Sequence, residues 1–389
     1  MTKSPHLILL TTDFKPNLGG ISQYLHHLWD ELSQYTSTTV ISIVPYQDKK
    51  LSHRYELKIL SSSLLNKNKT NSIVKTWQLL RDFHPQREIM PFIESLSGQP
   101  LEIFIGVWHP LSHIWCEALQ RANLPYSFFI YGQELITSQY RSWASKRSSD
   151  LKGAKQVYAC SEATAELAKV VTTYHLGTQI IYPGITSPEN SLSIETKAGI
   201  YRKELQLTGG PIVLSLCRLI HRKGIDLVLE SFTGLREKFP DLKYIVAGDG
   251  EEKEKLQQRT IDLKIDDQVI FLGAVDEETK TVLFALCDLF VMPVRDEPDN
   301  WEGFGMCFLE AAIAGKAAIG GKTGGVIEAI EEGVTGYLVN TDNATQTGRA
   351  MKKLLGDGDL RRRMGEAARK RAENFTWANS AARLWGMIQ

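Results

Sequence analysis

Residues 289–314 read LFVMPVRDEPDNWEGFGMCFLEAAIA, and this stretch decides the fold. It opens with the continuous apolar run Leu289–Met292, crosses a polar loop, and ends in the helical pattern Phe304–Ala314. A strand without polar alternation is typical of a parallel sheet that is buried on both faces, and the helix that follows covers one of those faces. The stretch therefore predicts one βα unit of a doubly wound α/β domain.

The same pattern of strand and helix repeats on both sides of this stretch. Strands that alternate with helical segments indicate βαβ units. Between two such series, Ile185–Glu195 is rich in Ser, Thr, Pro and Asn, which marks a linker. We predict two doubly wound α/β domains, Rossmann-like and separated by a cleft. The expected strands are His6–Thr12, Thr39–Val44, Leu101–Gly106, Tyr126–Tyr131, Gln156–Ala159 and Gln179–Tyr182, then Ile212–Leu216, Tyr244–Ala247, Val269–Phe271, Leu289–Met292 and Ala317–Ile319.

Length and composition agree with two domains and exclude several classes of protein. A chain of 389 residues suggests about two domains. Lys and Arg (45) balance Asp and Glu (45), so the chain lacks the basic excess of a general nucleic-acid binder. Five isolated cysteines form no zinc-ligand pattern, and no apolar run reaches the ~18 residues of a membrane span. We predict a cytoplasmic protein with no metal and no nucleic-acid partner.

Glycines follow the first predicted strand of the first domain and the second predicted strand of the second domain, where ligands of open parallel sheets bind. Gly19 and Gly20 stand at the start of a helix, so their backbone N–H groups are able to approach an anion closely. A plain tight turn explains this pair equally well. Gly248 ends a strand in a Gly-Asp-Gly turn that lacks the spacing of a dinucleotide fingerprint.

Two cations follow the strand Ile212–Leu216. Arg218 offers a guanidinium fork for phosphate oxygens, and Lys223 offers a compact point charge. The alternative is that both are solvated loop cations.

The loop and helix of the opening stretch carry two carboxylates. Glu302 precedes a turn of small residues, and Glu310 lies about two helical turns further on. Glu302 is suited to accept hydrogen bonds from hydroxyl groups, and Glu310 to clamp a diol, with the turn amides facing the same ligand. The structural alternatives are a helix-dipole partner for Glu302 and an exposed helix residue for Glu310.

These motifs together resemble family 4 of the retaining glycosyltransferases, which have the GT-B fold of two Rossmann-like domains. The Glu302-x7-Glu310 element is that family's most specific mark. Arg218 and Lys223-Gly224 are similar to its Arg-Leu-x-x-x-Lys-Gly loop, although Cys217 stands where glycine is usual. The resemblance covers nearly the full length and is strongest over roughly residues 211–340.

The resemblance implies roles for these residues. Arg218 and Lys223 would hold the donor diphosphate, which Gly19 and Gly20 would also touch. Glu302 would hold the hydroxyls of the transferred sugar, and Glu310 the ribose. The base would lie against the strand end at Val275. The remaining donor-binding residues implied are Gly248, Gly303, Phe304, Gly305 and Met306.

The resemblance also implies a domain plan: residues 1–185 bind the acceptor, 186–370 bind the donor, and 371–389 form a helix that returns to the first domain. The first domain departs from the family pattern, since Tyr131-Gly-Gln-Glu134 stands where His-Gly-x-Glu is frequent. His109 is then a candidate for the catalytic histidine, with a capping or core role equally open.

The expected activity is retaining, metal-independent transfer of a hexose from GDP-mannose or a UDP-sugar to a hydroxyl of a glycan or a lipid-linked acceptor. No resident cofactor is implied. A metal-dependent transferase using Asp296 and Asp299 is less favoured. A nicotinamide-dependent oxidoreductase lacks its glycine fingerprint, whereas a non-catalytic nucleotide-sugar-binding protein would carry the same binding residues.

A membrane contact is the last expectation. Arg141–Lys155 carries five cations against Asp150, with Trp143 among them. Such a helix in the first domain is able to rest on anionic lipid at the inner face of the membrane, although a solvated helix face is the more ordinary interpretation. The acceptor, the sugar, the base, the linkage and the oligomeric state are not fixed by these motifs.

Overall fold

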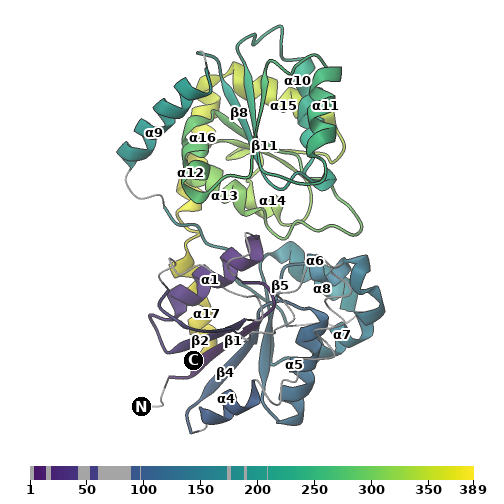
Figure 1. The fold of residues 1–389 in the computed structure, drawn as a ribbon, viewed down its shortest axis with the longest axis vertical. Helices are drawn as coiled ribbons and strands as arrows, with labels where there is room; N and C mark the ends of the chain where they lie inside the picture. Colours follow the sequence, from purple (N-terminus) through teal and green to yellow (C-terminus); the bar gives the residue numbers. More distant parts are fainter. Residues whose placement is uncertain are drawn as a thin grey trace. The chain divides into compact units, whose positions relative to one another are not determined.

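The computed structural model describes residues 4–14, 19–42, 53–59, 89–96, 98–172, 177–187, 191–207 and 209–389. The chain divides into two compact units (Figure 1). Unit 1 comprises Met1–Gly184 and Trp377–Gln389, and unit 2 comprises Ile185–Thr376. Asn17, Leu18 and the predicted strand end Val44 lie outside the described residues.

Unit 1 is built on a parallel sheet with the strand order β3-β2-β1-β4-β5-β6-β7. Its central strands are fully buried because they are apolar on both faces, as at Leu7–Leu10. The strands are β1 (His6–Thr11), β2 (Thr38–Ser42), β3 (Glu56–Ile59), β4 (Leu101–Ile105), β5 (Tyr126–Ile130), β6 (Gln156–Ala159) and β7 (Gln179–Ile180).

Helices lie on both sides of this sheet (Figure 1). The C-terminal helix α17 packs on α1 through aromatic rings: Trp377 stacks on His27 and meets Tyr24 edge to face. The described helices are α1 (Gly20–Leu32), α4 (Met90–Ser95), α5 (Pro110–Arg121), α6 (Gln133–Ile136), a 3-10 turn (Ser138–Trp143), α7 (Ala144–Lys152), α8 (Glu162–Thr172) and α17 (Trp377–Ile388).

Unit 2 is a second parallel sheet, with the order β10-β9-β8-β11-β12-β13. One layer of its core joins Val213, Phe232 and Tyr244, the last two rings being stacked at 5.5 Å. The strands are β8 (Ile212–Leu216), β9 (Lys243–Ala247), β10 (Val269–Gly273), β11 (Leu289–Met292), β12 (Ala318–Gly321) and β13 (Gly336–Val339).

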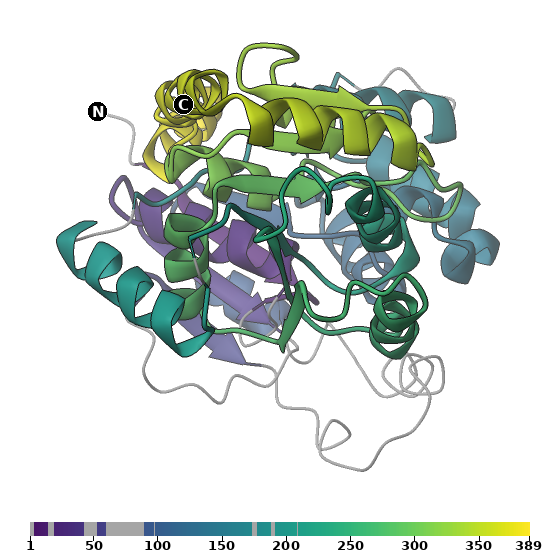
Figure 2. The same cartoon turned by 90° about the horizontal axis from the view of Figure 1, so that it is seen from above.

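The helices of unit 2 also cover both faces of the sheet, and α9 packs beside α12 at one edge of the unit (Figure 2). They are α9 (Ser191–Glu204), the 3-10 turn η2 (His221–Lys223), α10 (Ile225–Thr233), α11 (Lys253–Asp262), α12 (Glu277–Leu286), α13 (Met306–Ile313), α14 (Val326–Ala329), α15 (Ala344–Gly356) and α16 (Gly358–Ala372).

In each sheet the strand order reverses at one place, between β1 and β4 in unit 1 and between β8 and β11 in unit 2. Helices that follow the two strands of such a pair run to opposite faces, which leaves a crevice at the carboxyl ends of the strands. The loops that carry most of the predicted site residues start at these two switch points, whereas Gly248 and Val275 follow the neighbouring strands β9 and β10.

Two short edge strands, β3 and β13, are absent from the sequence prediction. Both lie at sheet edges, where the apolar run is short and mixed with polar residues, as in Glu56–Ile59. Within the described residues, no helix combines the length and the apolar character needed to cross a membrane.

Candidate functional site

The switch point of unit 2 brings together one carboxylate and two cations. Lys223 ends η2, after β8, and its Nζ lies 2.6 Å from Oε2 of Glu302, in the loop after β11. Arg222, from the same turn, donates to the same oxygen. The side chains of all three are at most 12% exposed. Residues 79 positions apart in the sequence thus form one buried charge cluster.

The two cations decide the charge of Glu302. Burial alone would raise the pKa of this carboxyl, but the charges and hydrogen bonds of Lys223 and Arg222 outweigh burial and lower the pKa to about 2. Glu302 is therefore a carboxylate throughout the neutral range. It is suited to accept hydrogen bonds from hydroxyl groups and unsuited to act as a proton donor.

The glycine-rich segment at the end of β12 packs against the backbone of Glu302. The N–H of Gly325 donates to the Glu302 carbonyl at 2.9 Å, and a Cβ at Gly325 would lie 2.1 Å from the carbonyl oxygen of Gly303. Only glycine permits this approach. The segment 320–325, which superficially resembles a phosphate-binding loop, thus contains the end of β12 and the turn that supports Glu302.

Arg295 holds η2 in place. Its guanidinium binds Asp226 through two hydrogen bonds, at 2.6 and 2.7 Å, and also donates to the carbonyl of His221 at 2.7 Å. It also pairs with Asp342. The backbone N–H of Arg295 donates to the Arg222 carbonyl at 2.7 Å. The loops after β8 and β11 are thereby tied together next to the charge cluster.

The predicted turn Gly303–Met306 leads into α13, which begins at Met306 with Gly305 as its N-cap. Phe304 is 3% exposed and packs on Phe375 with a centroid distance of 5.8 Å. Phe304 therefore anchors the turn in unit 2, while the backbone of its neighbours carries the polar groups.

Glu310 lies on α13 and is buried rather than exposed, its side chain being 12% exposed. Oε1 of Glu310 is 2.5 Å from Nζ of Lys280 on α12, and Lys280 is also 2.6 Å from Glu277. Burial raises the pKa of Glu310, an effect that Lys280 opposes.

The other predicted donor-binding residues lie at the same carboxyl edge of the sheet. Arg218 is exposed, and its side chain has no ion pair within the described part of the chain. Gly248, with φ of 135°, packs against the carbonyl of Cys217. Val275 is half-buried just after β10. The strands β8, β9, β10 and β11 thus each end near one predicted residue.

In unit 1, the predicted residues lie at the other switch point, after β1 and β4. Gly19 is the N-cap of α1, and Gly20 is its first residue. His109 is the N-cap of α5, and its Nδ1 accepts a hydrogen bond from the N–H of Leu111 at 3.2 Å. Burial lowers the pKa of His109 to about 4, so its imidazole is neutral at pH 7. The capping role that the sequence left open is thus observed.

The segment Tyr131-Gly-Gln-Glu134 is also buried in unit 1. Oε1 of Glu134 accepts a hydrogen bond from the N–H of Tyr131 at 2.7 Å. Arg147 donates to the backbone carbonyl of Glu134 at 2.9 Å, and Oε2 of Glu134 has no partner within the described residues. Burial raises the pKa of Glu134.

Sequence reasoning missed three residues of the unit 2 site: Arg222, Arg295 and Lys280. Arg222 is one of three consecutive polar residues, and nothing in the sequence tells which of them faces inward. The signal for Arg295 was available, since a cation directly after an apolar strand needs a buried partner. Lys280 stands in the first turn of α12, which is the unfavourable end of a helix for a cation, and this position is itself a signal.

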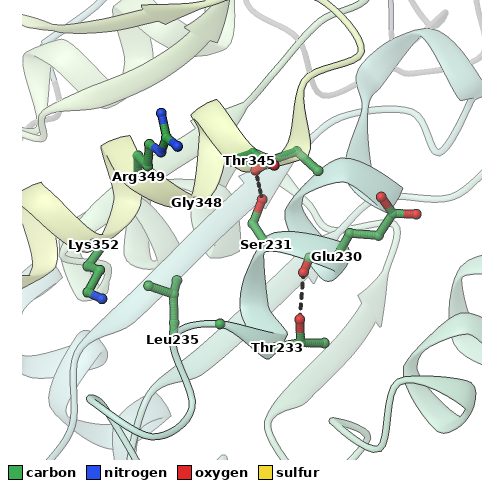
Figure 3. Close-up of a pocket in the computed structure, with 10 residues that line it drawn as sticks. Glu230, Ser231, Thr233, Leu235, Thr345, Gly348, Arg349 and Lys352 are labelled. Atoms are coloured by element: carbon green, nitrogen blue, oxygen red, sulfur yellow. Dashed lines mark hydrogen bonds between the residues drawn. The ribbon is translucent and has the colours of Figure 1, made fainter.

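A depression of about 440 Å³ lies elsewhere in unit 2, between α10 and α15 (Figure 3). It is lined by Ser231, Leu235, Arg349 and Lys352 among others, and Ser231 donates to the Ala344 carbonyl across it. None of the predicted site residues lines this depression. Within the described residues, no group of three or more His, Cys, Asp or Glu side chains is arranged to hold a metal ion.

The two Rossmann-like sheets with their covering helices are the GT-B fold, and solved structures agree over the full chain. HepE from Anabaena, solved in complex with UDP, matches 98% of this chain and 99% of its own with a TM-score of 0.76 at 18% identity. Sucrose-phosphate synthase from Thermosynechococcus elongatus matches 99% and 98% with a TM-score of 0.79, also at 18% identity.

Sequence comparisons add the class of enzyme. Residues 198–371 match the family model described as glycosyl transferases group 1. The chain is also 26% identical to a GDP-mannose-dependent alpha-(1-6)-phosphatidylinositol monomannoside mannosyltransferase from Mycolicibacterium smegmatis, over 97% of each protein. The chain thus resembles the family 4 glycosyltransferases, and these matches support a glycosyltransferase that uses a nucleotide sugar.

Proposed function

We propose that this protein is a retaining glycosyltransferase that moves a mannosyl residue from GDP-mannose to a hydroxyl of a lipid-linked acceptor, without a metal ion. The observation that carries the proposal is the buried cluster of Arg222, Lys223 and Glu302 at the switch point of unit 2. It places cations and a permanent carboxylate in the crevice where doubly wound sheets bind their ligands.

The cations suit a diphosphate leaving group. When the bond between the anomeric carbon and the donor phosphate oxygen breaks, negative charge develops on that oxygen. Lys223 and Arg218 would stabilise this charge, and Lys223 is already held in place by Glu302, so its part requires little reorganisation during the reaction. Gly19 and Gly20 at the start of α1 would add backbone donors from unit 1, and Gly248 would let the chain approach the phosphates.

Glu302 suits the transferred sugar. One of its oxygens, Oε2, accepts from both cations. The other, Oε1, accepts no hydrogen bond from the part of the chain that the structure describes, so it is open to a sugar hydroxyl. The amides of Gly303, Phe304, Gly305 and Met306 would hold the remaining hydroxyls, while Glu310 would hold the ribose and Val275 would contact the base.

Retention of configuration follows in this proposal from attack on the same face. The acceptor oxygen forms its bond to the anomeric carbon as the donor bond breaks, and the acceptor proton passes to the departing phosphate oxygen. A double displacement would need a carboxylate nucleophile at the sugar. Glu302 is already committed to two cations. His109, a helix cap, would contact the sugar from unit 1.

The donor and the acceptor are proposed from the relatives. The full-length relative from M. smegmatis is named for GDP-mannose and for an acceptor built on phosphatidylinositol. A UDP-sugar is the second candidate, because HepE was solved with UDP. By the same comparison, we propose that residues 1–185 bind the acceptor and 186–370 bind the donor.

Because the proposed acceptor is lipid-linked, the proposal includes a contact between unit 1 and the inner face of the membrane. The structure corrects one element of the sequence-based patch: Arg147 is buried and bonds the Glu134 carbonyl, so it is not a lipid contact. Arg141, Lys146 and Lys152 are exposed, and Lys146 lies 4.5 Å above the ring of Trp143. The variant Arg141→Glu/Lys146→Glu should reduce co-sedimentation with vesicles containing phosphatidylinositol. Unchanged sedimentation would remove the membrane contact from the proposal.

The donor site is tested by thermal stabilisation with GDP, UDP, ADP and NAD, each with and without EDTA. A ligand at ~100 times its dissociation constant adds about 2.7 kcal/mol of stability. We expect a shift with GDP that ignores EDTA and is lost in Arg218→Ala. A response to NAD alone would favour an oxidoreductase, and a shift lost with EDTA would favour a metal-dependent site.

Turnover separates an enzyme from a non-catalytic binding protein with the same site. We expect slow release of GDP from GDP-mannose in the absence of acceptor, faster release with phosphatidylinositol monomannoside, and an α-anomer product by NMR. Tight GDP-mannose binding without any turnover would support the binding protein, and a β-anomer would contradict retention.

A further inference from the structure

Lys280 is a cation in an unfavourable place. It belongs to the first turn of α12, where the helix dipole disfavours positive charge, and its side chain is only 14% exposed. A long cationic side chain is rarely buried unless a partner compensates for it. Lys280 has two partners: the exposed Glu277 on its own helix, at 2.6 Å, and the buried Glu310 on α13, whose Oε1 lies 2.5 Å from Lys280 Nζ.

The pair leaves one carboxylate oxygen open. Lys280 binds Oε1, while Oε2 of Glu310 accepts no hydrogen bond from any residue in the described part of the chain. Two adjacent hydroxyls, as on a ribose, are bound best by a charged carboxylate, because charge-assisted hydrogen bonds are about twice as strong as neutral ones. The carboxyl must therefore stay ionised and keep its orientation.

We propose that Lys280 is a positioning residue for the donor: it holds Glu310 in the orientation and charge state that bind the ribose hydroxyls. The inference rests on the proposed function, in which Glu310 binds the ribose. Lys280 itself need not touch the nucleotide, since it acts through Oε1 of Glu310 and leaves Oε2 for the ligand.

Among the charges that act on Glu310 in the described part of the chain, Lys280 is the one that favours the ionised carboxylate. Burial raises the pKa of Glu310, and the negative charge of Glu277 on α12 adds to that rise. Lys280 is the cation that opposes both effects. The helices α14 and α16 also pack on α13, and within the described residues neither contributes a charge that acts on Glu310. Without Lys280, the carboxyl would take up a proton at a higher pH and lose its fixed orientation.

The test measures the affinity for GDP, UDP and inorganic pyrophosphate by calorimetry in wild type, Lys280→Met and Lys280→Arg from pH 5 to 8. We expect Lys280→Met to weaken binding of the preferred nucleoside diphosphate at least tenfold at pH 7, with the acid limb of binding moved to higher pH. Pyrophosphate, which has no ribose, should bind unchanged. Lys280→Arg should restore nucleotide affinity to within about threefold of wild type.

Two controls separate a specific role from general damage. Lys255→Met removes an exposed lysine that pairs with Glu252 on α11, and it should leave every affinity unchanged. In a Glu310→Gln background, which removes the buried charge, Lys280→Met should cause no further loss of nucleotide affinity, as expected for two residues that act as a unit.

The inference would be overturned if Lys280→Met bound the nucleotide as tightly as wild type, or if it lost as much affinity for pyrophosphate as for the nucleotide. Either result would leave the proposed function intact. If wild type bound pyrophosphate but neither GDP nor UDP, the proposed function would fail, and the role of Lys280 would fail with it.

Discussion

Unit 1 and unit 2 each bury a glutamate at the carboxyl edge of a parallel sheet, Glu134 in the short helix α6 and Glu302 in a loop, and the two carboxyls behave in opposite ways. In unit 2, Lys223 and Arg222 lower the pKa of Glu302 to about 2. In unit 1, burial raises the pKa of Glu134 and is not offset by Arg147, which donates to the backbone carbonyl of Glu134 and not to its carboxyl. Two similar folds therefore support different chemistry. Glu302 is suited to hold a permanent negative charge among cations, whereas burial of Glu134 disfavours its charged form.

The largest expected effect is on turnover, and it concerns a cation of the charge cluster in unit 2. Lys223→Met removes a cation from the place where leaving-group charge develops, so turnover of GDP-mannose should fall about 10²–10³-fold, the usual cost of losing one preorganised donor. The matched control Lys255→Met removes an exposed lysine and should leave turnover unchanged. Turnover within threefold of wild type in Lys223→Met would show that this cation takes no part in catalysis.

The next largest effect is a difference in unfolding free energy between variants of the two glutamates, measured by urea unfolding at pH 7. Glu302→Gln leaves two buried cations without their counter-charge and should cost about 3 kcal/mol of unfolding free energy or more. Glu134→Gln keeps the acceptor for Tyr131 and removes a charge that its surroundings disfavour, so it should cost about 1 kcal/mol or less. If both variants lost the same stability, the two carboxyls would not differ in the way described.

Two glycines, Gly248 after β9 in unit 2 and Gly106 after β4 in unit 1, allow the packing of the loops in the two units to be compared. A Cβ at Gly248 in unit 2 would lie 1.8 Å from the Cys217 carbonyl oxygen, and its φ of 135° is itself unfavourable for alanine. A Cβ at Gly106 in unit 1 would meet Thr11 Oγ1 at 2.8 Å and both Leu25 Cδ1 and Thr11 Cβ at 2.9 Å, which are side-chain contacts longer than the backbone clash at Gly248. We expect about 3 kcal/mol for Gly248→Ala and about 1 kcal/mol for Gly106→Ala by urea unfolding. The reverse order would contradict the packing described for these loops.

The smallest effect is a pH dependence in unit 1. Burial lowers the pKa of His109 to about 4 from 6.5, so the unfolded chain binds the proton first as the pH falls. The stability that His109 contributes is complete above pH 6.5 and is lost between pH 6.5 and about 4. His109→Asn retains a capping oxygen and has no titrating group, so its stability should fall less than that of wild type over this range. Parallel pH profiles for the two proteins would rule out a buried neutral histidine. Glu302 contributes in a lower window, from about pH 4.5 down to about 2.

Much of the fold was predictable because parallel strands that are buried on both faces leave an apolar signature, as in Leu289–Met292. Edge strands such as Gly336–Val339 leave none. In the site, Glu302 and Lys223 were found from the sequence because each follows a predicted strand, where ligands of open parallel sheets bind, and each stands in a motif of the family that the chain resembles. Their partner Arg222 was not found, since the direction of a side chain in a 3-10 turn depends on contacts such as those of Arg295. Pairing across 30 positions, as between Lys280 and Glu310, is equally invisible before the helices pack.

The central claim is that the charge cluster of unit 2 belongs to a nucleotide-sugar site, and amide hydrogen exchange with and without GDP tests it most directly. We expect GDP to slow exchange in residues 216–224 and 301–310, while the depression between α10 and α15 (Figure 3) exchanges as before. The effect should disappear in Arg218→Ala. Protection confined to the α10–α15 depression, or no protection at saturating GDP, would contradict the account.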